Sequence, residues 1–110
     1  MKLVKQPTPT TCGQACLAMA LSMTLKQAIQ LVGHDGITTS DEIVQALTTI
    51  TGMYHNAKFG LPPNKGRYIV YHKEPGGKRG HWTFMEDGTL YDPAQIKNLW
   101  DIEKYIEVKL

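Results

Sequence analysis

One apolar stretch near the N-terminus decides the fold, and it runs Cys12-Gly13-Gln14-Ala15-Cys16-Leu17-Ala18-Met19-Ala20-Leu21-Ser22-Met23. Its apolar residues recur at helical spacing, and the alanines among them provide small surfaces for close packing. The pattern therefore predicts a first helix over about residues 13–23, packed in the middle of the protein. Pro7 and Pro9 precede it, and proline disfavours helix at the residue before it, so residues 1–11 are expected to be extended.

Two shorter helices are predicted next, because two segments carry the signals of a capped start and a glycine end. Each begins with a threonine that is followed three residues later by Gln or Glu, which is the capping-box pattern. The capping pairs are Thr24 with Gln27 and Thr39 with Glu42, and the terminating glycines are Gly33 and Gly52. The predicted helices cover residues 25–32 and about 40–51.

The second half of the chain favours strands. Residues 67–73 are rich in Tyr, Ile and Val, and residues 81–86 and 89–92 flank Asp87-Gly88, a dipeptide typical of type I′ hairpin turns. Residues 53–66 are expected to be mostly loop. For the tail Ala94–Leu110 we expect a short helix, with a final strand over residues 106–110 as the alternative. Helices first and strands second predict an α+β fold, with the N-terminal helices packed on an antiparallel sheet.

Length and charge exclude several classes of protein. A chain of 110 residues predicts one domain spanning residues 1–110, and a net charge of +2 is too small to favour a nucleic acid partner. No apolar run reaches the ~18 residues of a membrane span, and the N-terminus lacks the apolar core of a secretory signal. The two cysteines are too close in sequence to close a long loop, so we expect a reducing, cytoplasmic setting.

The two cysteines are expected to differ. Cys12 lies at the predicted start of the first helix, where free N–H groups and the helix dipole favour a negatively charged sulfur. Gly13 follows it and is expected to allow a tight backbone that leaves the sulfur approachable. Cys16 lies one turn further along the apolar stripe, so it is predicted to be a core residue. Cys12 is thus the candidate nucleophile.

The hairpin predicts a partner for this cysteine. If Asp87-Gly88 form a two-residue loop, Thr83 faces Asp92, and His81 lies two residues before Thr83 on the same face. His81 and Asp92 are then diagonal neighbours, with about 7–8 Å between their backbone positions. The Asp92 carboxylate could hold one ring nitrogen of His81 while the other faces Cys12. A register slip of one residue would abolish this arrangement.

The remaining histidines do not predict a metal site. His34, His55 and His72 together with the two cysteines lack the ligand spacings of zinc sites, so no metal and no cofactor are expected. Gly76-Gly77 lacks the following Gly-Lys-Ser/Thr and helix of a phosphate-binding loop, and it predicts a flexible connection.

The opening segment resembles the first motif of the C39 peptidases, which belong to the papain-like cysteine proteases. In that motif a glutamine stands six positions before the nucleophilic cysteine, which begins Cys-Gly-x-Ala and an apolar helix; Gln6 and Cys12 have this spacing. The similarity extends over roughly residues 4–95. Its further parts are His34-Asp35-Gly36-Ile37-Thr38, Tyr68–His72, His81-Trp82 and Tyr91-Asp92-Pro93. Thr11 departs from the motif, because exporter-linked members usually carry Asp there.

The resemblance implies a minimal papain-like cysteine protease fold and a role for each matched residue. Cys12 would be the nucleophile, His81 the general base and acid, and Asp92 its orienting partner, while Gln6 would help the Cys12 backbone N–H form the oxyanion hole. A narrow cleft near Trp82 would suit a peptide or protein substrate with Gly-Gly before the scissile bond, or a ubiquitin-like C-terminal tail. We therefore expect a thiol-dependent peptidase. Two alternatives stay open: a thiol acyl or amide transferase with the same triad, and a catalytically weak binding protein with the same fold.

Overall fold

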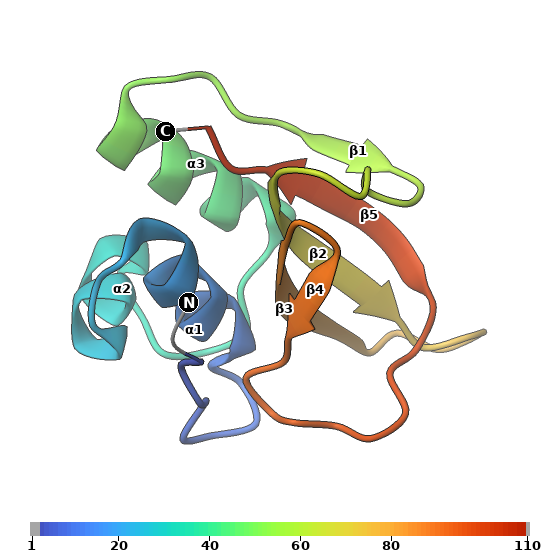
Figure 1. The fold of residues 1–110 in the computed structure, drawn as a ribbon. Helices are drawn as coiled ribbons and strands as arrows, with labels where there is room; N and C mark the ends of the chain where they lie inside the picture. Colours follow the sequence, from blue (N-terminus) through green and yellow to red (C-terminus); the bar gives the residue numbers. More distant parts are fainter. Residues whose placement is uncertain (1–2, 110) are drawn as a thin grey trace.

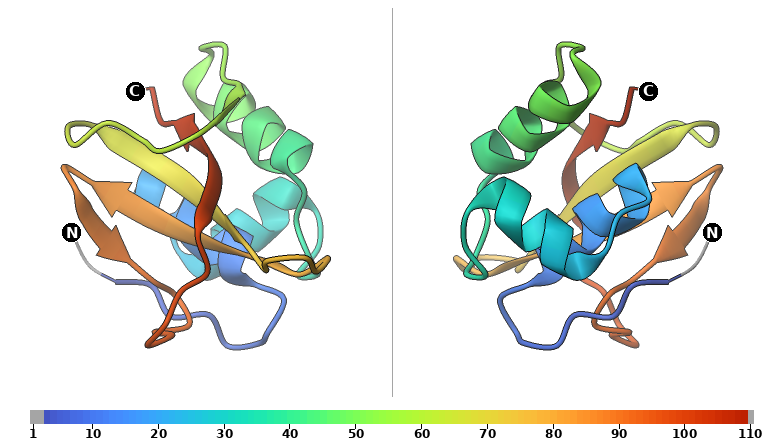
Figure 2. Two further views of the ribbon diagram at one scale, coloured as in Figure 1. Left: turned by 90° about the vertical axis from the view of Figure 1, so that its right-hand side faces the viewer. Right: turned by 90° about the vertical axis from the view of Figure 1, so that its left-hand side faces the viewer.

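A computed structural model describes residues 3–109 and contains three helices on one face of a five-stranded antiparallel sheet (Figures 1 and 2). The helices are α1 (Cys12–Leu21), α2 (Leu25–Val32) and α3 (Ser40–Thr51). The strands are β1 (Ala57–Phe59), β2 (Arg67–Lys73), β3 (Gly80–Glu86), β4 (Thr89–Tyr91) and β5 (Ile102–Glu107), in the sheet order β1-β5-β2-β3-β4. The predicted α+β class is confirmed.

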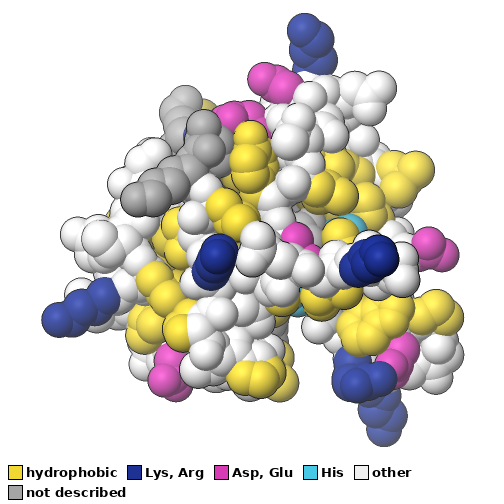
Figure 3. All heavy atoms as spheres, turned by 60° about the horizontal axis from the view of Figure 1, so that its bottom comes forward, with side chains coloured by type: hydrophobic (Ala, Val, Ile, Leu, Met, Phe, Trp, Pro, Cys, Tyr) yellow, Lys and Arg dark blue, Asp and Glu magenta, His cyan; other side chains and the backbone are white. Residues whose placement is uncertain are grey.

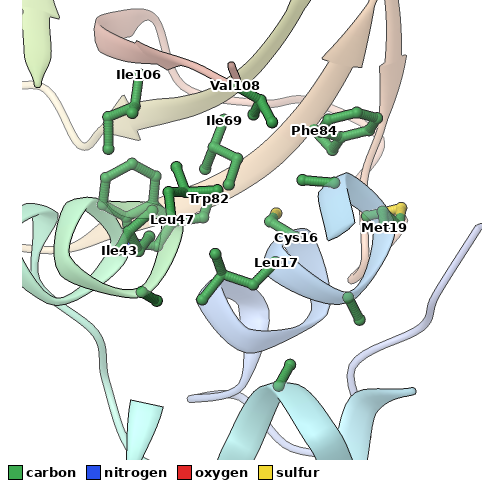
Figure 4. Packing of buried hydrophobic residues seen from close by; sticks show 14 of the residues in the cluster. Cys16, Leu17, Met19, Ile43, Leu47, Ile69, Trp82, Phe84, Ile106 and Val108 are labelled. Atoms are coloured by element: carbon green, nitrogen blue, oxygen red, sulfur yellow. The ribbon is translucent and has the colours of Figure 1, made fainter. Parts of the chain in front are cut away.

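Helix α1 is the centre of the core. Nine of its ten residues are buried, and its alanines allow it to lie close against β2 and β3. Figure 4 shows Cys16 and Leu17 of α1 among side chains from α3 and the strands. At the far end of the helix, the Arg67 guanidinium donates to the Ala20 carbonyl at 2.6 Å, which places a cation at the negative end of the helix dipole. The sheet thus fixes both the side and the C-terminal end of α1.

The predicted helix ends are confirmed for α2 and α3. Both helices have a complete capping box at the start, and both end at a glycine in the left-handed conformation, with φ of 98° at Gly33 and 70° at Gly52. Helix α1 ends at Leu21, two residues earlier than predicted, because Ser22 adopts φ 53° and breaks the helical path.

The β3–β4 hairpin has the predicted register. Asp87 and Gly88 have φ of 49° and 84°, the positive pair that a type I′ turn requires. Phe84 consequently faces Tyr91 across the two strands. This register determines on which side of the sheet Asp92, the residue after β4, lies.

One sequence prediction in the second half was wrong. The predicted helix in the tail is absent from residues 94–109, and residues 102–107 form β5 between β1 and β2. The alternative strand over 106–110 is right in kind, but β5 starts four residues earlier and ends at Glu107; Leu110 lies outside the described residues. A β-bulge in β5, opposite Tyr71 and His72, places Ile102 and Ile106 in two different apolar clusters. The four-residue spacing of these isoleucines matches a helix, and because of the bulge the apolar residues do not alternate as they would in a regular strand.

Residues 53–66 are mostly loop, as predicted, but they contain one strand that was not predicted, β1. It has only three residues and pairs with β5 at the edge of the sheet. Phe59 in this strand is 79% exposed, so no buried face produced an alternating pattern in the sequence.

No helix within residues 3–109 is by itself long and apolar enough to cross a membrane. Helices α1 and α2 meet the length and composition together, but only as a pair bent by 112°. Helix α1 is buried inside the protein over nine of its ten residues, as expected for a core helix.

Gly13 allows a close approach that the sequence did not predict. Its backbone is part of α1 and has no positive φ, so the expected tight turn at this position is wrong. A Cβ built on Gly13 would lie 1.9 Å from the hydroxyl oxygen of Thr38. Thr38 is buried, and its carbonyl accepts a hydrogen bond from the Trp82 indole at 3.3 Å. Glycine is therefore required so that residue 38 can pack against α1 and hold β3.

Gly13→Ala is expected to lower the free energy of unfolding by about 1–3 kcal/mol, because the new methyl group overpacks the contact with Thr38. The loss should occur although alanine favours helix over glycine by about 1 kcal/mol. Urea unfolding followed by circular dichroism measures it. In a Thr38→Ala background, which removes the clashing hydroxyl, the penalty should shrink by at least about half if coupling of contacting residues governs it. An equal loss in both backgrounds would contradict the packing explanation.

Candidate active site

Cys12 is the first residue of α1 and is 9% exposed. The preceding residue, Thr11, makes no cap hydrogen bond to the helix, and its hydroxyl donates instead to the Thr8 carbonyl at 3.1 Å. Helices α2 and α3, by contrast, begin with complete capping boxes. The Thr11 side chain thus leaves the first-turn amides of α1 unbonded, and their positive partial charge is at the end of the helix where Cys12 lies.

The predicted His81–Asp92 neighbourhood is confirmed. His81 lies at the start of β3 and Asp92 directly follows β4, and His81 Nε2 is 2.6 Å from Asp92 Oδ1. The His81 side chain is buried and that of Asp92 is partly buried, with 7% and 11% exposed. Since a carboxylate accepts, Nε2 carries the proton and Nδ1 is left for another partner.

Backbone amides hold the Asp92 carboxylate in place. Its Oδ1 accepts from the Ala94 amide at 2.9 Å, and its Oδ2 accepts from the Ile96 amide at 2.7 Å. These two hydrogen bonds fix the orientation of the carboxylate that His81 contacts. Asp92 is built to orient His81 and to compensate its positive charge.

Cys12 lies close enough to His81 to change its titration. Burial is the largest influence and lowers the pKa of His81, but hydrogen bonding and charge interactions with Cys12 and Asp92 outweigh it and raise the pKa above its ordinary value. Because Asp92 occupies Nε2, the ring nitrogen available to the thiol is Nδ1. A raised pKa favours the imidazolium, which in turn stabilises a thiolate. A helix start, a strand start and a strand end thus bring the three predicted residues together.

Cys16 is a core residue, as predicted. It is fully buried one turn after Cys12. Burial first, and then the negative charges of Cys12 and Asp92, raise the pKa of its thiol well above the usual value. Cys16 is therefore a neutral thiol at neutral pH, chemically different from its neighbour.

Gln6 is brought to the same end of the molecule, but its side chain turns back into its own segment. Its backbone amide donates to the Pro93 carbonyl at 3.0 Å, next to Asp92. The side-chain amide nitrogen donates to the Thr8 carbonyl at 2.9 Å, and the amide oxygen is buried without a hydrogen-bond partner among the described residues. The contribution of Gln6 to an oxyanion hole stays a prediction.

Trp82 occupies a core position. It is 3% exposed, its ring centroid lies 4.6 Å from that of Tyr71, and its indole N–H donates to the Thr38 carbonyl. These contacts tie the loop before α3 to the strand that carries His81. Trp82 as a substrate contact stays a prediction, because the described contacts are those of a supporting core residue.

His34 and His55 make hydrogen bonds that hold parts of the fold other than the triad. His34 pairs with Glu42, and His55 bonds the Met53 carbonyl through Nδ1 and the Lys109 amide through Nε2. Within residues 3–109 no group of three or more His, Cys, Asp or Glu side chains is arranged to bind a metal ion.

The role of His72 was not recognised from the sequence. In the structure it faces His81 directly across β2 and β3. These strands are joined by a glycine-rich connection instead of a two-residue turn, so the sequence offered no signal for their register.

The surface at this end has no continuous basic area. Residues 3–11, which precede α1, and residues 92–101 run along the lower end of Figure 1, and Figure 3 brings that end forward. Lysine and arginine side chains lie apart over most of this face, and a little histidine surface is visible among uncharged atoms. One surface hollow is lined by residues 73–77 and 101–103, and another lies between α2 and α3.

Comparison with known proteins does not supply a family. No protein-family model matches the chain, and a search of curated proteins finds no matching relative. A functional assignment therefore rests on the arrangement of Cys12, His81 and Asp92 and on the motifs in the sequence.

Proposed function

We propose that the protein is a thiol-dependent peptidase of minimal papain-like fold that cleaves a peptide or isopeptide bond. The observation that carries the proposal is the buried His81–Asp92 pair at 2.6 Å, with Cys12 beside the imidazole at the uncapped start of α1. A cysteine nucleophile, an imidazole and a group that orients the imidazole are the three parts that this chemistry requires. The order of helices and strands, with the nucleophile opening a buried helix, supports the papain-like assignment.

In the first half of the reaction the Cys12 thiolate attacks the substrate carbonyl carbon. A sulfur–carbon bond forms, and the carbonyl π electrons move to the oxygen. When the tetrahedral intermediate collapses, the carbon–nitrogen bond breaks and the His81 imidazolium gives its Nδ1 proton to the leaving amine. Asp92 keeps the ring oriented and stabilises its positive charge through Nε2.

In the second half water replaces the amine. His81, now neutral, takes a proton from water through Nδ1 while the water oxygen attacks the thioester carbon. The sulfur–carbon bond then breaks, which releases the carboxylic acid and restores the thiolate–imidazolium pair. The triad residues suffice for this cycle, so it needs no metal or cofactor.

The oxyanion would lie beside the first-turn amides of α1. The Cys12 backbone N–H is the nearest donor by sequence, and an oxyanion there also gains from the helix dipole. Gln6 is the second proposed donor. Its side-chain nitrogen has two hydrogens and gives one to Thr8, so a second is available once a substrate is bound.

The proposed substrate is a peptide or protein segment with small residues before the scissile bond, such as Gly-Gly or a ubiquitin-like tail. The small exposed fraction of Cys12 supports this class, because a backbone without bulky side chains reaches a recessed sulfur most easily. A reduced Cys12 is required, so we place the reaction in a reducing compartment such as the cytoplasm.

Cys12→Ala is expected to reduce cleavage by at least about 10³-fold, because it removes the nucleophile. Cys16→Ala should retain cleavage, since Cys16 does not take part in the chemistry. A panel of fluorogenic peptides with Gly-Gly before the reporter measures both. Product analysis with an added amine separates hydrolysis from transfer. Equal cleavage by Cys12→Ala and the unchanged protein would refute the peptidase, and an absence of turnover with intact Cys12 would favour the binding protein.

Iodoacetamide at neutral pH is expected to alkylate Cys12 at least about tenfold faster than Cys16, because the reactive species is the thiolate and burial keeps Cys16 neutral. Peptide mass spectrometry of timed samples gives both rates. In urea the two cysteines should react at similar rates, which controls for local sequence. Equal slow rates in the folded protein would contradict the assignment of Cys12.

Asp92→Asn is expected to lower the pKa of His81, because the Asp92 carboxylate is one of the groups that raise it. A raised folded-state pKa adds stability that is fully present below the unfolded pKa of about 6.5 and is lost as pH rises through the folded pKa. The variant should therefore flatten the decline in unfolding free energy above that pH. Imidazole NMR titration and urea unfolding at several pH values measure the two effects. An unchanged His81 pKa would count against the pair.

A further inference from the structure

A second buried histidine lies next to the proposed triad. His72 is 2% exposed and is the direct cross-strand partner of His81 in the antiparallel pairing of β2 and β3. Residues that face each other in this way project on the same side of the sheet. Two imidazoles are therefore neighbours in the core, and only one of them belongs to the triad.

Both ring nitrogens of His72 are hydrogen bonded. Nδ1 lies 2.9 Å from the Trp100 carbonyl oxygen, and Nε2 lies 2.8 Å from the Thr83 hydroxyl oxygen. Because a carbonyl only accepts, Nδ1 carries the proton, and Nε2 accepts from Thr83. Burial is the largest influence and lowers the pKa of His72. The hydrogen bond to Trp100 and the charge of Asp92 raise this pKa, His81 lowers it further, and the net shift is downward. His72 is therefore a neutral ring of fixed tautomer.

The Trp100 contact connects His72 to the segment that carries Asp92. This segment, residues 92–101, joins β4 to β5, and most of its middle is exposed. Its first residue binds His81, and near its other end the Trp100 carbonyl binds His72 and the Asp101 carbonyl accepts from the Lys73 amide at 3.0 Å. Two facing histidines thus anchor the two ends of one connection.

Resting on the proposed function, we propose that His72 is a positioning residue for the His81–Asp92 pair. Its Nδ1–H anchors the far end of segment 92–101 and so keeps Asp92 at its bonding distance from His81. Its neutral ring supports the His81 imidazole without adding a positive charge beside the imidazolium. The Thr83 hydroxyl fixes the ring but is not the contact that reaches Asp92.

Two matched variants separate positioning from simple core packing. In His72→Asn the amide nitrogen can take the place of Nδ1 and keep the Trp100 bond, while the Thr83 bond is lost. In His72→Gln the amide oxygen can take the place of Nε2 and keep the Thr83 bond, while the Trp100 bond is lost. Both replace a ring by an amide, so a purely structural role predicts similar effects. Thr83→Val is the control that removes the hydroxyl and leaves Nδ1 bound.

The readouts are the NMR pKa of His81 and the rate of Cys12 alkylation by iodoacetamide at neutral pH. We expect the alkylation rate to fall about tenfold or more in His72→Gln, because misplacement of reacting groups slows a reaction. The rate should stay within about threefold of the unchanged protein in His72→Asn and Thr83→Val. The His81 pKa should fall in His72→Gln alone. Equal pKa values and equal rates in the Asn and Gln variants would overturn the proposal.

Two further measurements keep the outcomes distinct. His81→Ala in the same assay tests the triad itself: an unchanged Cys12 rate refutes the proposed function, whereas a reduced rate with equal Asn and Gln variants refutes only the role of His72. If a variant fails to fold, imidazole nitrogen shifts of the unchanged protein still decide. A proton on Nδ1 and none on Nε2 of His72 at neutral pH supports the anchor, and the opposite tautomer excludes it.

Discussion

The close packing of α1 on the sheet is the constraint on which the rest of the structure depends. The helix is buried over nine of its ten residues, and Gly13 leaves room for the Thr38 side chain to lie directly against it. Truncating a buried residue such as Leu17 in an interface of this kind typically costs about 2–5 kcal/mol. Because Arg67 binds the C-terminal end of α1 and Thr38 packs against Gly13, the helix can neither slide nor tilt freely. The position of Cys12 follows from these contacts.

The hairpin supplies the other half of the site. Its type I′ turn fixes the register of β3 and β4, and this register puts the residue after β4 on the side where His81 begins β3. The Asp92 carboxylate then organises the following turn by accepting two backbone amides. The imidazole thus receives a preorganised partner whose position depends on turn chemistry, while the thiol receives its position from helix packing. The two halves meet only in the folded protein.

Local signals predicted most of the fold and the geometry of the site. Capping boxes and glycines located α2 and α3, and Asp87-Gly88 fixed the hairpin and with it the His81–Asp92 contact. Elements that depend on tertiary context were not predicted from the sequence. The bulge in β5 interrupts the alternation of apolar residues, so the strand was predicted as a helix. Strand β1 has too few buried residues to produce an alternating apolar pattern. The role of His72 was not predicted either, because the pairing of β2 with β3 depends on a long connection whose register is not encoded in a turn.

The site also explains why α1 differs from the other helices at its start. Helices α2 and α3 satisfy their first amides with threonine and Gln or Glu side chains, and such caps stabilise a helix by about 1 kcal/mol each. Thr11 makes no such bond, so α1 forgoes this stabilisation at the residue where the sulfur lies. The two facing histidines also differ: Cys12 and Asp92 raise the pKa of His81, whereas burial lowers the pKa of His72. Two adjacent imidazolium ions would repel each other, so a charged His81 requires a neutral neighbour. The positive charge of His81 is thus favoured both by the groups that raise its pKa and by a neighbouring histidine that stays neutral.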